Sequence, residues 1–330
     1  MLLNTPCRIL KPCTPMLPHR LLSRFSQTSS RLRSVAAAAP ENSTTNCPMV
    51  LAVTTITACS VATAACVAVA LSEENRMDRW NDRWQRGNIS WHRSQPYGIL
   101  VKHYDQFIGV SGSQAKSDGA HQRYRVLVPL CGKTLDMPFL ADKGHEVVGV
   151  EGCETAAWQL QRDAWLKFQV SQHASQGVAS DGQKRFIAAP TFGKKRTGYV
   201  FKTDEQGTGY YLDAKPLKWF RDTRKRVSVV IQDFMHVGPR DIGTFDRIWD
   251  RGSLVAIRPQ DRMDYVAVCD SLLEPGGRIL LATYNYDQDR MEGPPHSIPL
   301  AEVKRLYGRH GYTVELLGSE DVCNDHKVSQ

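Results

Sequence analysis

Several chemical signatures are missing from this 330-residue sequence. It has no GxGxxG run, which disfavours a nicotinamide or flavin dinucleotide cofactor and hence an oxidoreductase. The segment PLCGKT ends like a phosphate-binding loop, but that loop needs a glycine at position 127, where the chain has Leu127. The nine cysteines form no CxxC pair and no cluster with histidine. We therefore expect neither disulfides nor a metal site, and predict cysteines that pack in a reduced interior.

Acidic residues are absent from the first forty positions, which contain Arg8, Lys11, Arg20, Arg24, Arg31 and Arg33. This composition is typical of a mitochondrial transit peptide, and a disordered basic tail is the alternative. We expect residues 1–47 to be a basic presequence without folded structure. The expected location is mitochondrial, with a cytoplasmic protein as the alternative.

An apolar segment follows at residues 48–71, and its positions 50–71 carry no charge. That length is sufficient to span a bilayer, which takes about 20 residues. The segment is rich in Ala and Thr, so its hydrophobicity is mild. A membrane span, a sorting signal removed on import and a buried helix all remain open interpretations.

The most informative stretch is residues 125–151, which predicts a strand, a turn, a helix, a turn and a second strand. Residues 125–128 are a short apolar run, Pro129 ends it, and Gly132 permits a sharp turn and a close approach of backbone to ligand. Glu151 follows the second apolar run. An acid about 20 residues beyond the first turn is where nucleotide-binding α/β domains hold ribose hydroxyls. An ordinary structural turn with a surface glutamate is the alternative.

The remaining chain alternates between apolar runs and helical periodicity. Strands are predicted at 227–232, 245–249, 278–284 and 312–317, and helices at 97–107, 154–170, 261–273 and 299–307. A turn is expected at Pro275-Gly276-Gly277. The pattern predicts an α/β fold with a doubly wound, mainly parallel sheet over residues 76–330. Ligands bind such sheets at the carboxyl ends of the strands, where Gly132, Glu151, Asp233-Phe234 and Asp250-Arg251 are expected.

An insert at about residues 171–226 interrupts this alternation. We expect it to be irregular apart from a β-hairpin that joins residues 199–201 to 210–212. Its three basic clusters favour a solvated insertion, because they lack interleaved aromatic residues and a nucleic-acid motif. No nucleic-acid partner is therefore expected.

Three tryptophans lie close together at the start of the domain. Trp80 and Trp84 share one face of a predicted helix, and Trp91 follows after a break. They could cap the core, or form an aromatic lid over a flat heterocycle.

Five motifs resemble the thiopurine S-methyltransferase family: Trp80-x3-Trp84, PLCGK at 129–133, GHEVVGVE at 144–151, IWDRGSLVAI at 248–257 and GPP at 293–295. The resemblance implies a Rossmann-like class I fold that binds S-adenosylmethionine. It further implies cofactor contacts from Trp80, Trp84, Leu130, Glu151, Asp233, Phe234 and Arg251. Trp91 corresponds to the family's aromatic residue beside the methyl acceptor. No residue is assigned as a catalytic base.

The resemblance implies methyl transfer to the sulfur of a small-molecule thiol, of thiopurine-like aromatic or heterocyclic type. The alternatives are methylation of sulfide, thiocyanate or halide, and an inactive cofactor-binding scaffold. We expect a monomer, with membrane association through residues 50–71 as an open hypothesis. The family's final antiparallel strand has no match in the sequence, which predicts that the strand at 312–317 is left as an exposed edge.

Overall fold

The computed structural model describes residues 3–12, 77–109, 122–173, 186–193, 199–212 and 217–321. Its helices cover residues 77–85, α2 (Gly98–Lys102), α3 (Tyr104–Ile108), α4 (Asp136–Asp142), α5 (Glu154–Asp163), α6 (Pro239–Ile242), α7 (Arg262–Leu272) and α8 (Leu300–Gly308). The strands are β1 (Leu3–Leu10), β2 (Arg125–Val128), β3 (Glu146–Glu151), β4 (Gln169–His173), β5 (Phe186–Ala188), β6 (Tyr199–Asp204), β7 (Gly207–Leu212), β8 (Leu217–Asp222), β9 (Val227–Ile231), β10 (Phe245–Arg251), β11 (Leu273–Asn285), β12 (Thr313–Leu316) and β13 (Glu320–Asp321).

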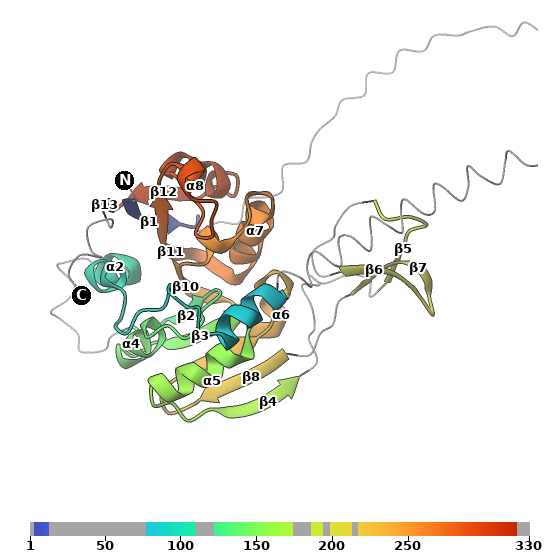
Figure 1. Ribbon diagram of the computed structural model, residues 1–330, viewed down its shortest axis with the longest axis horizontal. Coiled ribbons are helices and arrows are strands. Elements are labelled where there is room, and N and C mark those ends of the chain that lie inside the picture. The colour runs from blue at the N-terminus through green and yellow to red at the C-terminus, as the bar shows by residue number, and fades with distance from the viewer. Residues whose placement is uncertain are drawn as a thin grey trace, which may run out of the picture.

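One large sheet organises the molecule, with the strand order β12-β1-β11-β10-β2-β3-β9-β8-β4. The strands from β11 to β9 in this order pair in parallel, whereas β1, β8 and β4 pair antiparallel to their neighbours. Figure 1 shows helices on both faces of the sheet. The predicted doubly wound, mainly parallel α/β fold is confirmed.

Alternate side chains of each buried strand enter two separate cores, because successive residues of a strand point to opposite faces. In β2, Val126 and Val128 pack against the helices α2 to α5, whereas Leu127 joins the core beneath α7 and α8. Strands buried on both faces are hydrophobic at nearly every position. This explains why the central strands could be read from short apolar runs.

Residues 3–10 form a strand, whereas residues 1–47 as a whole were expected to lack folded structure. Leu3–Leu10 forms β1, which lies between β11 and β12 and pairs antiparallel with both. The family's final antiparallel strand has no match in the sequence, and a strand from the N-terminal part of the chain pairs with β12 instead. β12 still lies at the edge of the sheet, but one of its two sides is paired with β1.

The insert is more regular than expected. β4 and β8 extend the main sheet, and β5, β7 and β6 form a separate three-stranded sheet. The predicted hairpin is confirmed, since β6 and β7 pair antiparallel from Tyr199↔Leu212 to Asp204↔Gly207.

Three element boundaries also differ from the sequence prediction. The helix predicted at 97–107 is divided at His103 into α2 and α3, and α5 ends at Asp163 instead of continuing to residue 170. The expected turn at 275–277 lies within β11, beside an irregularity in its pairing with β10.

The apolar segment 48–71 lies outside the described residues, as do most of residues 1–47. Among the helices of the described ranges, none combines the length and apolarity that a membrane span requires.

Candidate active site

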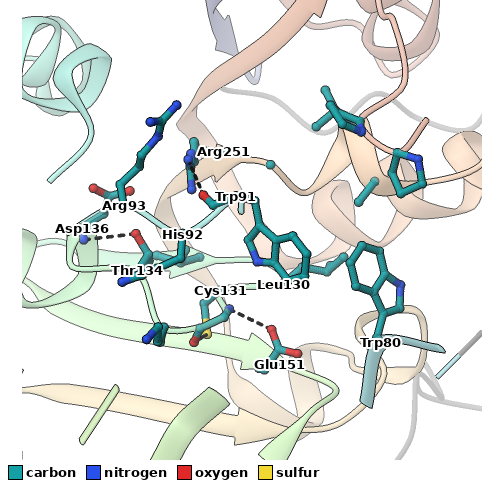
Figure 2. A pocket seen from close by; sticks show the side chains of 18 of the residues that line it. Trp80, Trp91, His92, Arg93, Leu130, Cys131, Thr134, Asp136, Glu151 and Arg251 are labelled. Atoms are coloured by element: carbon teal, nitrogen blue, oxygen red, sulfur yellow. Dashed lines mark hydrogen bonds between the residues drawn. The ribbon is translucent and has the colours of Figure 1, made fainter. Parts of the chain in front are cut away.

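A single cavity of about 730 Å³ lies at the carboxyl ends of the parallel strands, and all eight predicted site residues line it. They come from the helix at 77–85, the segment that follows it, and the ends of β2, β3, β9 and β10. The volume is within the range of small-molecule sites. Figure 2 shows Trp80, Trp91, Leu130, Glu151 and Arg251 around this space.

The turn after β2 holds the Glu151 carboxylate in place. Gly132 has φ +52°, a left-handed conformation that suits glycine, and its N–H donates to Glu151 Oε2 at 2.8 Å. The N–H of Cys153 donates to Oε1 at 2.9 Å. Glu151 is 8% exposed. Burial raises its pKa, and the N–H groups of Cys153 and Gly132 oppose that rise. A carboxylate oxygen has more than one acceptor site, so both oxygens can still accept a ligand hydroxyl.

The three tryptophans form a small cluster beside the turn after β2. Trp80 and Trp84 each make an edge-on contact with Trp91, with ring centroids 5.4 and 6.0 Å apart. The Arg83 guanidinium lies 5.5 Å from the Trp80 ring and 5.4 Å from the Trp91 ring. A Cβ on Gly132 would come within 3.2 Å of the Trp84 ring, so the glycine permits this packing.

Arg251, at the end of β10, joins the sheet to the segment that carries Trp91. Its Nη2 donates to the Trp91 carbonyl at 2.7 Å, and its guanidinium lies 4.6 Å from the centre of the Tyr97 ring. Arginine is well suited to this double role, because its planar group can stack and donate at once. One edge of the guanidinium is therefore already used to position the aromatic side of the cavity.

Asp136 is a buried acid of the cavity wall that the sequence analysis did not identify. Its Oδ1 accepts from the backbone N–H of Tyr97 at 2.6 Å, and its Oδ2 accepts from the Trp249 indole at 2.8 Å. An aspartate in the first turn of a helix is common, so its position in the sequence did not distinguish it. Its partners are distant in the sequence, and only the fold reveals them.

The end of β10 is fixed by a second buried acid, Asp250. It accepts from the Tyr265 hydroxyl at 2.8 Å and from the Leu254 N–H at 3.1 Å. Burial raises the pKa of Asp250 to about 6. Ser253 donates to the Pro129 carbonyl at 2.7 Å, which ties the turn after β10 to the end of β2.

The end of β9 presents Asp233 and Phe234 to the cavity. Asp233 Oδ1 accepts from the Met235 N–H at 3.0 Å and so caps the short 3-10 helix Phe234–His236. The Phe234 ring is 3% exposed and packs at 5.1 Å from the Tyr265 ring. The acid and the ring are thus held in fixed positions.

The cavity wall also carries two basic residues, Lys133 and His92, that were not among the predicted site residues. Lys133 is mostly buried and pairs with Asp163 at 2.8 Å. The His92 pKa is lowered, first by burial and then by Lys133. His92 is therefore expected to be neutral at pH 7, since its ordinary pKa of about 6.5 lies below that value.

These residues fit an adenosyl ligand. The glycine turn leaves backbone close to the cavity, the adjoining acid faces it, and apolar and aromatic side chains surround both. No group of histidine, cysteine and acidic residues able to hold a metal occurs in the described ranges. The cysteines that the structure describes, Cys7, Cys131, Cys153 and Cys269, are free and buried.

Known proteins resemble this chain in sequence. The family model for thiopurine S-methyltransferase matches residues 75–199 and 207–330. Thiopurine S-methyltransferase of Rattus norvegicus is 33% identical over 233 residues, which are 70% of this chain and 77% of the relative. The enzyme of Oryctolagus cuniculus is 33% identical over 232 residues, or 70% and 75% of the two chains.

A solved structure of 1,6-didemethyltoxoflavin-N1-methyltransferase from Burkholderia thailandensis, with 1,6-didemethyltoxoflavin and S-adenosylhomocysteine bound, covers 82% of each chain at 15% identity and a TM-score of 0.40. The family model and the curated relatives decide the matter: this chain belongs to the thiopurine S-methyltransferase family and is an S-adenosylmethionine-dependent methyltransferase.

Proposed function

We propose that this enzyme transfers the methyl group of S-adenosylmethionine to the sulfur of a small aromatic or heterocyclic thiol. The observation that carries the proposal is the composition of one cavity. It combines the buried Glu151 carboxylate with an aromatic and cationic wall formed by Trp91, Tyr97 and Arg251. A flat ring with an acidic thiol complements such a wall, because aromatic rings stack and a thiolate is attracted to a guanidinium.

We propose that the cofactor is held by the seven residues Trp80, Trp84, Leu130, Glu151, Asp233, Phe234 and Arg251. Glu151 accepts the ribose hydroxyls with the acceptor positions that Gly132 and Cys153 leave open. Asp233 and Phe234 lie at the end of the neighbouring strand β9 and contact the adenine. Trp91 is proposed to contact the methyl acceptor.

The cofactor supplies an electrophilic methyl group on a sulfonium. The protein's contribution is then to hold the acceptor sulfur in line with that carbon and to exclude water. Placement of this kind can supply roughly 7–11 kcal/mol. An aromatic thiol ionises readily, so the protein needs no strong base. Arg251 favours the thiolate by its charge.

The reason for considering an inactive scaffold has weakened. It rested on an absent antiparallel strand and on the basic insert, and β1 now pairs with β12 on the side that the absent strand was expected to leave open. Sulfide, thiocyanate and halide are smaller soft nucleophiles that would leave the aromatic wall without a stacking partner. They are treated as competing outcomes of the experiment.

The experiment measures transfer of a labelled methyl group from S-adenosylmethionine to a panel of acceptors. The panel contains a thiopurine, a thiophenol, the matching phenol, sulfide, thiocyanate and iodide. We expect turnover of the aromatic thiols and none of the phenol.

Replacement Arg251→Met should raise the pH at which turnover is half-maximal, toward the pKa of the free thiol. The control is Arg258→Met, because Arg258 also lines the cavity but pairs with Asp261 at 2.8 Å. A preference for sulfide or iodide, or no turnover of any thiol, would overturn the proposal.

A further inference from the structure

Strand β1 lies outside the part of the sequence that matches the family, but it pairs with strands of that part. The family match begins at residue 75, whereas β1 comprises Leu3–Leu10. It pairs with β11 over eight positions, from Leu3↔Asn285 to Leu10↔Arg278, and with β12 over four. An element from the distant N-terminus thus completes the part of the sheet that carries Tyr284 of the cavity.

The side chains of β1 fit this position specifically. Cys7 and Ile9 are fully buried in the core beneath α7 and α8. On the opposite face, Arg8 Nε donates to Glu315 of β12 at 3.0 Å. Lys11, just after the strand, donates to the carbonyls of Asp270 and Leu273 at 2.6 Å each. A strand held only by its backbone would show no such set of partners.

Pro6 fits its place in the strand as well. Its carbonyl accepts from the Leu317 N–H at 3.0 Å, so the polar groups of Pro6 face β12. The pairing with β12 starts only at Cys7. The N–H that Pro6 lacks would therefore point toward Leu317, one position beyond β12, so the proline removes no hydrogen bond from the pairing of β1 with β12.

The beginning of β1 reaches the active site. Asn4 pairs with Glu320 and Leu3 with Asp321, and both partners belong to β13. Glu320 lines the cavity and forms an ion pair with Lys102 at 2.5 Å. The hydroxyl of Thr283 in β11 donates to the Thr5 carbonyl at 3.3 Å. Loss of β1 would release both β13 and one side of β11 at the cavity wall.

We propose that the groove between β11 and β12 is a strand-binding site whose ligand is residues 3–11 of this same chain, and that the methyltransferase requires this ligand. Residues 13–76 connect the ligand to the helix at 77–85, so a cut in that connection would leave β1 attached only by its contacts. Addition of a strand to a sheet is an established mode of peptide binding.

This proposal limits how the N-terminus can be processed. A mitochondrial presequence removed by cleavage at any point from residue 12 to 76 would free the strand from the covalent chain. The segment would then either stay bound as a separate peptide or leave an open groove.

The test uses the full chain with a specific protease site placed between residues 13 and 76 and cleaved after folding. We expect the N-terminal fragment to co-elute with the remaining chain in size-exclusion chromatography, and the melting temperature to stay near that of the uncleaved protein. The same chain with Ile9→Asp should lose the fragment on cleavage, and its melting temperature should fall by roughly 10 °C. The matched control Arg8→Gln alters the partly exposed face of β1 and should retain the fragment.

A fluorescent peptide of residues 3–11 should bind the cleaved Ile9→Asp protein after the fragment has left, and a peptide with the same Ile9→Asp change should not. If Ile9→Asp prevents folding, co-elution of the unsubstituted cleaved protein decides alone. Departure of the fragment without any change in melting temperature or in S-adenosylhomocysteine binding would overturn the proposal. None of these readouts requires turnover of a thiol, so they stand apart from the test of the proposed function.

Discussion

The indole N–H of Trp249 donates to Asp136 at 2.8 Å, and this contact ties the centre of β10 to the first turn of α4. The second oxygen of Asp136 accepts from the Tyr97 N–H. Tyr97 in turn lies against the Arg251 guanidinium. A buried carboxylate outside the predicted set of ligand contacts thus positions the aromatic wall of the cavity.

Replacement Asp136→Ala removes the acceptor of two N–H donors, the buried Trp249 indole and the partly buried Tyr97 backbone. Each unsatisfied donor costs about 1–3 kcal/mol. We expect a fall in melting temperature of about 5–15 °C, and a several-fold rise in KM for the thiol because Tyr97 is released. S-adenosylhomocysteine affinity should change by less than about 2-fold, since Glu151 and Gly132 keep their contact. The control Trp249→Phe removes the indole donor alone, and we expect it to lower stability without raising KM. An unchanged KM in Asp136→Ala would contradict the positioning role.

Glu151 is expected to dominate cofactor affinity. A hydrogen bond to a charged group is worth about 1.5–3 kcal/mol, so Glu151→Gln should weaken S-adenosylhomocysteine binding by roughly 10- to 150-fold. Isothermal titration calorimetry measures the change. The control is Glu146→Gln at the other end of β3, where the glutamate is about half exposed and pairs with Arg125. Equal affinities of the two variants for S-adenosylhomocysteine would show that Glu151 does not bind the ligand.

Much of this arrangement could be predicted from local sequence. The central strands are buried on both faces, so β2, β3 and β9 are apolar at most positions, and polar residues such as Glu151 and Asp233 indicate where the strands end. The carboxyl ends of parallel strands lie at one edge of the sheet. Glu151, Asp233, Phe234 and Arg251 were expected from the strand ends. The family resemblance implied the other four site residues, and all eight line one cavity.

β1 and Asp136 could not be predicted in the same way, for a physical reason. The segment LNTPCRIL contains a proline and an arginine and lies in a basic region, so its local composition favours no strand. Its alternation of Thr5, Cys7 and Ile9 was the one available signal. The strand forms because β11 and β12 offer backbone partners and a buried face, and both are more than 260 positions away.

Asp250 provides a prediction about pH. Its pKa is raised by burial from 3.8 to about 6 in the folded protein, so the folded state binds the proton more tightly than the unfolded state. Stability from this group is present below pH 3.8 and is lost as pH rises to about 6. The difference in unfolding free energy between the wild type and Asp250→Asn should therefore decrease by up to about 3 kcal/mol between pH 4 and pH 7.

Denaturant unfolding of both proteins across this range measures the decrease. Asp270 supplies a control of opposite sign. Burial acts to raise its pKa, but the Tyr312 hydroxyl and the charge of Lys11 outweigh burial and lower the pKa below 3.8. The stability that Asp270 contributes is present above pH 3.8 and is lost only as pH falls below that value. Asp270→Asn should therefore show a nearly constant difference between pH 5 and pH 7. A constant difference for Asp250→Asn as well would show that Asp250 has an ordinary pKa.

Gly132→Ala tests whether the turn after β2 must approach the tryptophan cluster. Gly132 has φ +52° and Gly144 has φ +100°, so alanine is strained at both positions, at a cost of roughly 1–2 kcal/mol. A Cβ at 132 meets the Trp84 ring at 3.2 Å, whereas a Cβ at 144 meets nothing within 4 Å. We expect both variants to lose about 2–8 °C in melting temperature. Only Gly132→Ala should also weaken S-adenosylhomocysteine binding, by at least about 10-fold, because Trp84 and the N–H that holds Glu151 are displaced together.

A titration of tryptophan fluorescence with S-adenosylhomocysteine measures the binding. Gly144→Ala should respond at the same ligand concentrations as the wild type, and Gly132→Ala only at higher concentrations. Equal titration curves for the two glycine variants would mean that the tryptophan cluster and the glutamate turn act independently.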